Sequence, residues 1–149
     1  MNNKYFLGID PWSHKIGIAI VDSQKKIVYK NIINPINIVD ILNSIIEEYD
    51  IEDVAIGNSS NSKKLISYLN LVKIYRANQK KKLNIHIIDE RNSTLEARKF
   101  FVQKEKNPLK RFWTYICSIF LPLDDYAAFV IACRLISKQD NVNKQKQNL

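Results

Sequence analysis

Carboxylates interrupt apolar sequence at three separate places in this chain. Asp10 follows one short apolar run, Asp89 and Glu90 follow another, and Asp124 and Asp125 stand between two more. Three acids gathered in one place repel each other unless a divalent cation neutralises them. Mg²⁺ and Mn²⁺ prefer oxygen ligands of this kind, usually with substrate phosphates completing the shell. The residue types therefore predict a divalent metal site, provided that the fold brings these places together.

Each acid also has a purely structural explanation. Asp10 begins an Asp-Pro-Xaa-Ser sequence that suits a type I turn, and for Asp10 alone the turn is slightly favoured. Asp124 and Asp125 fall in the predicted first turn of a helix, where the helix dipole favours acids. Arg91 can form a weak surface ion pair with either acid before it. Only the position of all these acids at the ends of elements favours a site.

The surrounding pattern predicts an α/β fold. Short β-branched runs predict strands over Tyr5–Ile9, Lys15–Asp22, Lys26–Ile33, Asp53–Gly57 and Asn84–Ile88. Apolar stripes and a capping box predict helices over Asn37–Tyr49, Lys63–Lys81, Ser93–Val102 and Leu123–Ser137. The first three strands are joined by short connections and the others alternate with helices. We therefore expect a mixed five-stranded sheet, with an antiparallel meander followed by parallel strands and with helices on its faces. At its carboxyl edge, strand ends and a helix start can converge.

Composition limits the class of protein. A chain of 149 residues predicts one domain, which we expect over residues 1–137, followed by a polar disordered tail over 138–149. The net charge of +8 favours an anionic partner such as nucleic acid. No signal peptide or membrane-spanning run is apparent, and Cys117 and Cys133 match no metal-ligand spacing. We expect a cytoplasmic protein with reduced thiols and no membrane partner.

Four segments resemble the YqgF family of ribonuclease H-like nucleases, also described as Holliday junction resolvases. "LGIDPWSHKIGIAIVD" is similar to the first family motif, "DVAIGN" to the next strand, and "PLDDYAAFVIACRLI" to the closing helix. "IIDERNSTLEAR" closely resembles the Asp-Glu-Arg motif and is the most specific of the four. The resemblance runs from Leu7 to about Ile136. It implies a ribonuclease H-like fold and a nuclease.

The resemblance also implies roles for individual residues. Asp10, Glu90 and Asp124 correspond to the metal-binding catalytic acids, with two Mg²⁺ or Mn²⁺ ions expected, and Asp125 is at most a helper. Lys15 and Arg91 correspond to basic positions that bind substrate phosphate. The implied substrate is the 16S ribosomal RNA precursor, cut during its 5′ maturation; the alternatives are branched DNA, on which a resolvase acts as a homodimer, and a scaffold that binds nucleic acid without cutting it.

Two features depart from the family pattern. Trp12 occupies a position that is usually glycine, so we expect a remodelled first turn and a narrowed groove. The apolar segment 112–121 is unusual, and it could serve a dimer or pack on the sheet.

Overall fold

The computed structural model describes residues 4–12, 14–89, 91, 96, 98–99, 102–103, 105–118 and 123–147. Its strands are β1 (Tyr5–Pro11), β2 (Ile16–Asp22), β3 (Ile27–Ile33), β4 (Asp53–Gly57) and β5 (Asn84–Ile88). Its helices are α1 (Ile38–Glu48), α2 (Ser62–Asn78), α4 (Pro108–Ser118) and α5 (Asp124–Gln147). Residues 90 and 92–95 lie outside the described part, so the helix predicted over Ser93–Val102 is tested at only a few positions.

The strands form one sheet in the order β3-β2-β1-β4-β5. The pairs β1–β2 and β2–β3 are antiparallel, whereas β1–β4 and β4–β5 are parallel. This arrangement confirms the predicted mixed sheet. Because β1 runs parallel to β4 and β5, the carboxyl ends of these three strands lie at one edge of the sheet, where the acids were expected to meet.

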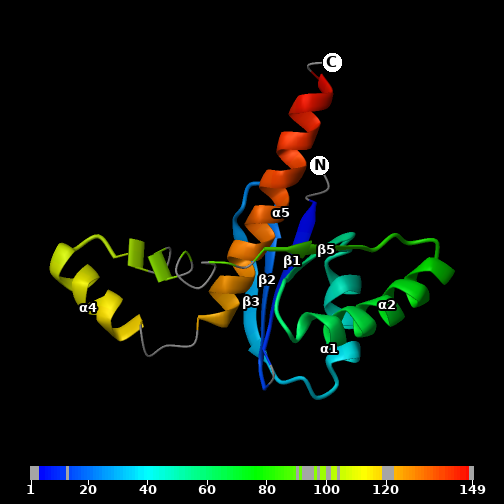
Figure 1. The fold of residues 1–149 in the computed structure, drawn as a ribbon, viewed down its shortest axis with the longest axis horizontal. Coiled ribbons are helices and arrows are strands. Elements are labelled where there is room, and N and C mark those ends of the chain that lie inside the picture. Colours follow the sequence, from blue (N-terminus) through cyan, green and yellow to red (C-terminus); the bar gives the residue numbers. More distant parts are fainter. Residues whose placement is uncertain are drawn as a thin grey trace.

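Alternation along the central strand divides the core into two layers. Leu7 and Ile9 of β1 pack with residues of α1 and α2 on one face, while Phe6 packs with residues of α5 on the other. Figure 1 shows α5 crossing one face of the sheet, with α1 and α2 on the opposite side. Gly8 and Asp10 share the face of Phe6 because side chains alternate along a strand. Asp10 therefore lies on the α5 face.

The structure adds one helix that was not predicted and extends the last predicted helix. The apolar segment after residue 107 is helical as α4, which begins at Pro108, a residue favoured in the first turn of a helix. The last helix continues to Gln147 rather than ending at Ser137, so residues 138–147 are helical where a disordered tail was expected. Figure 1 shows α4 apart from the sheet and the end of α5 extending beyond it. No helix in the described ranges is long and apolar enough to cross a membrane.

A polar cluster surrounds the buried Asp53 at the opposite end of the sheet, where β4 and β5 begin. Lys4 Nζ lies 2.7 Å from Asp53 Oδ2, while His86 Nε2 and Asn84 Nδ2 lie 2.8 and 3.2 Å from Oδ1. Burial by itself raises the pKa of this carboxyl, but the hydrogen bonds from its three neighbours together outweigh burial. The pKa of Asp53 is therefore held below its usual value.

This cluster predicts acid sensitivity. The unfolded-state pKa of an aspartate is about 3.9, and the folded-state pKa of Asp53 is lower, so the unfolded chain binds more protons at acid pH. The contribution of Asp53 is complete above about pH 4 and is lost as the pH falls through its folded-state pKa. Asp53→Asn should lower Tm at pH 7 and flatten the fall in Tm below pH 4, measured by circular dichroism. Asp40→Asn, at an exposed acid of α1, is the control; parallel curves for Asp53→Asn and wild type would contradict the prediction.

Candidate active site

Asp10 lies near the carboxyl end of β1 and is only 5% exposed. It belongs to the strand rather than to a type I turn, because Asp10 and Pro11 pair with Gly17 and Ile16 of β2. The hairpin turn begins at Trp12, whose backbone N–H donates to the Lys15 carbonyl at 3.1 Å. The strand pairing thus fixes the Asp10 carboxylate at the sheet edge.

Asp124 is brought to Asp10 by a glycine. A Cβ atom placed on Gly17 would lie 2.0 Å from the backbone oxygen of Asp124, so the start of α5 rests directly on the backbone of β2. Gly17 is the residue opposite Asp10, and residues opposite each other in an antiparallel pair point to the same face. Asp10 and the start of α5 at Asp124 therefore lie next to each other on the α5 face of the sheet.

Lysines neutralise both acids at the start of α5. Lys15 Nζ lies 2.7 Å from Asp124 Oδ2, and Lys30 Nζ lies 2.5 Å from Asp125 Oδ2. No donor among the described residues meets hydrogen-bond geometry at the buried Asp124 Oδ2, so the Lys15 contact is one of charge rather than a well-aligned hydrogen bond. The ion pair with Lys30 links Asp125 to β3, which fits the expectation that Asp125 at most assists the metal-binding acids.

The two gathered carboxylates fit a hard divalent cation. Asp10 and Asp124 are both buried, and among the described residues the buried Oδ2 of Asp124 is compensated by the Lys15 ammonium group alone. Such an oxygen is a suitable ligand for Mg²⁺ or Mn²⁺. Glu90, the third predicted ligand, lies outside the described residues, and within them no group of three or more His, Cys, Asp or Glu side chains could hold a metal. Of the three predicted ligands, the structure describes Asp10 and Asp124.

Arg91 lies beyond the end of β5, which is separated from β1 by β4. Its guanidinium binds Asp89, with Nε and Nη2 each 2.8 Å from Oδ2, and its backbone N–H donates to Oδ1 at 3.0 Å. These hydrogen bonds hold the pKa of Asp89 below its usual value. Arg91 is highly exposed and lies at the same carboxyl edge as the acids, but no contact joins it to Asp10 or Asp124 among the described residues.

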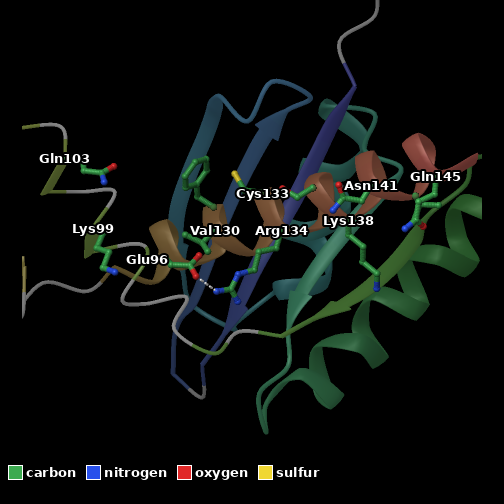
Figure 2. A pocket seen from close by; sticks show the side chains of 12 residues that line it. Glu96, Lys99, Gln103, Val130, Cys133, Arg134, Lys138, Asn141 and Gln145 are labelled. Atoms are coloured by element: carbon green, nitrogen blue, oxygen red, sulfur yellow. Dashed lines mark hydrogen bonds and ion pairs between the residues drawn. The ribbon is translucent and has the colours of Figure 1, made fainter. Parts of the chain in front are cut away.

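Arg134 connects α5 to the residues after β5, and the sequence analysis missed it. From α5 its guanidinium donates to the backbone oxygens of Asp89 and Arg91, and Nη2 lies 2.7 Å from a Glu96 carboxylate oxygen. Figure 2 shows Arg134 pointing from α5 towards Glu96. These contacts link Asp89 and Arg91 to the helix that begins at Asp124. A lone cation in the apolar run "AAFVIACRLI" was the available signal.

One cavity of the described structure lies away from the acids. It measures about 720 Å³ and lies along α5, between Cys133 and residues such as Glu96 and Gln103 (Figure 2). Neither Asp10 nor Asp124 lines it. Cys133 is a free thiol, and burial raises its pKa to about 12, so it remains protonated at neutral pH. The cavity thus offers no reactive thiolate.

Comparisons with known proteins give a matching family and similar folds. The family model described as "RuvX: Holliday junction resolvase" matches residues 4–132. No curated protein matches. Among solved structures, Thermus thermophilus RuvC in complex with a Holliday junction substrate is similar, with 14% identity and a TM-score of 0.58 over 87% of this chain and 90% of that one.

A second Thermus thermophilus RuvC structure has 10% identity and a TM-score of 0.52, over 86% of this chain and 90% of that one. At these identities the likeness concerns the fold, and it confirms the ribonuclease H-like class predicted from the sequence. The family match, which covers most of the chain, confirms the family relationship expected from the motifs. The chain belongs to the RuvX family of Holliday junction resolvases.

Proposed function

We propose that this protein is a divalent-metal-dependent nuclease that hydrolyses phosphodiester bonds of structured nucleic acid. One observation carries the proposal: Asp10 lies opposite Gly17, and the absence of a side chain at Gly17 lets Asp124 start its helix directly above the strand. Two buried acids brought together from distant parts of the chain are costly unless a cation neutralises them.

The described acids would hold the metal together with Glu90. Asp10 and Asp124 offer carboxylate oxygens at one sheet edge, and Glu90 follows β5 at the same edge in the sequence. Two bound Mg²⁺ or Mn²⁺ ions would supply an activated water and stabilise charge on the leaving oxygen. Lys15 neutralises Asp124 and could turn to substrate phosphate where a metal ion takes over that acid. Arg91 would contact phosphate further along the edge.

The family description supports branched DNA as a substrate, on which a resolvase would act as a homodimer because the junction is symmetric. The resemblance of the Asp-Glu-Arg segment supports the second candidate, 5′ maturation of the 16S ribosomal RNA precursor. Either role would place the protein in the cytoplasm.

The test is cleavage by the purified protein of a DNA four-way junction and of a 5′-extended 16S precursor RNA. Mn²⁺, Mg²⁺ and EDTA are compared, and Glu90→Gln is run beside the wild type. We expect metal-dependent cutting that Glu90→Gln abolishes, and the substrate cut faster decides between the two roles. Binding of both substrates without cutting in any metal would overturn the nuclease and favour a scaffold.

The proposed phosphate contact of Lys15 predicts a change in salt dependence. Each phosphate contact that a lysine makes adds nearly one unit to the slope of log K against log salt. In the Glu90→Gln background, Lys15→Met should reduce that slope by about one and weaken the binding of different nucleic-acid sequences to the same extent. Binding is measured by fluorescence anisotropy in buffer that contains the metal. Lys26→Met, at an exposed lysine in the turn between β2 and β3, is the matched control. An unchanged slope for Lys15→Met would remove Lys15 from the binding surface.

A further inference from the structure

Trp12 is a large aromatic residue that is half exposed beside the candidate catalytic acid. The residue is 50% exposed, and its indole Nε1–H donates to Asp10 Oδ2 at 3.0 Å. Single exposed apolar side chains are ordinary on protein surfaces. This one differs because its polar edge is bonded to a buried acid of the site, while half of its surface stays open to solvent.

The backbone around Trp12 is held on both sides. Its N–H donates to the Lys15 carbonyl at 3.1 Å, and the Ser59 hydroxyl, from the loop after β4, donates to the Pro11 carbonyl at 3.1 Å. With the indole bond to Asp10, three hydrogen bonds fix the residue at the carboxyl edge of the sheet. A side chain already fixed in position loses little conformational entropy when a ligand packs against it.

The surroundings suit nucleic acid. Lys15, at the other end of the same turn, is partly exposed, and a hollow lined by Asn58, Ile87, Asp89 and Arg91 lies at the neighbouring strand ends. An aromatic face next to cations is the combination with which proteins hold unpaired nucleotides, because every base has a π-face. A duplex keeps its bases stacked inside and cannot offer one without unpairing.

We propose that Trp12 is a specificity-determining residue that stacks on an unpaired nucleobase next to the phosphodiester that is cut at the site of Asp10. This rests on the proposed nuclease function and deepens it. It makes the protein select nucleic acid whose bases are already unstacked at the cutting point, such as a branch point or a single-stranded extension, over continuous duplex.

The test measures binding without cleavage. Trp113, the other of the two tryptophans, is replaced by Phe so that fluorescence reports Trp12 alone. The protein is titrated in EDTA with a single strand, a four-way junction and a continuous duplex of equal length. We expect the first two ligands to quench Trp12 and the duplex not to. Trp12→Ala should weaken binding of the quenching ligands on the order of tenfold and leave duplex binding unchanged.

Trp12→Phe separates stacking from the bond to Asp10. Phenylalanine keeps an aromatic face but cannot donate a hydrogen bond, so it should retain binding to within about threefold if stacking is the cause. Equal losses on all three ligands, or no quenching by the single strand and junction, would overturn the proposal. If the single strand and the junction quench Trp12 fluorescence in EDTA but neither is cut in Mn²⁺, the stacking proposal stands and only the proposed nuclease function is overturned. Metal-dependent cleavage without quenching of Trp12 would support the nuclease function and overturn the stacking proposal.

Discussion

Replacing Asp10 by asparagine is expected to reduce metal-dependent cleavage by at least about 10³-fold while leaving the fold intact. Asparagine has the shape of aspartate, and its amide oxygen can still accept the indole bond from Trp12. It lacks the negative charge that a divalent ion needs. Metal stabilisation of a phosphoryl transition state is worth several kcal/mol, and about 1.4 kcal/mol corresponds to tenfold in rate.

Two measurements check this prediction. Single-turnover cleavage in Mn²⁺ gives the rate, and thermal unfolding in EDTA gives the stability, which we expect to be unchanged or slightly raised because Asp124 loses a nearby like charge. Asp22→Asn is the matched control, since Asp22 lies at the opposite end of the sheet, where it accepts backbone hydrogen bonds from Gln24 and Lys26. Wild-type cleavage by Asp10→Asn would show that the site has been assigned to the wrong acid.

The second large effect is expected at Gly17. A Cβ added there would lie 2.0 and 2.2 Å from the backbone oxygen and carbon of Asp124 and 2.8 Å from the backbone nitrogen of Asp125. These are backbone atoms, which no rotamer change can move aside, so α5 must shift away from the sheet. Gly17→Ala should cost about 3 kcal/mol of unfolding free energy, or roughly 10 °C in Tm.

Gly8→Ala is the comparison variant. A Cβ added at Gly8 would lie 2.0 Å from the backbone oxygen of Ala128, so Gly8→Ala should be destabilised by a similar amount. The clash in this variant lies at a later turn of α5, away from the acids. At a temperature where both variants remain folded, we expect Gly17→Ala to bind Mn²⁺ more weakly than Gly8→Ala in titration calorimetry. A Tm for Gly17→Ala within about 2 °C of wild type would mean that α5 does not rest on β2 as described.

Local sequence was enough to find the five strands and the helices α1 and α2. β-Branched runs of five to eight residues and an apolar stripe at helical spacing are properties of neighbouring residues. The runs reproduce Asp53–Gly57 and Asn84–Ile88 without error. The polar end of α5 was missed because residues 138–147 have few apolar side chains, whereas good helix formers continue a helix that packing has already started.

For the candidate site, too, the sequence indicated some features and the tertiary structure decided others. The residue types and the motif resemblance pointed to Asp10, Glu90 and Asp124 as candidate metal ligands, and their assignment as ligands stays a prediction. Only the tertiary structure decided how Asp10 and Asp124 meet: across 114 positions of chain, through a glycine of β2 that lets a helix backbone touch the sheet. It also decided that Lys15 faces Asp124, that Trp12 bonds to Asp10, and that Arg134 holds the Asp89–Arg91 segment. Such contacts depend on the packing of distant elements, which no local pattern of residues encodes.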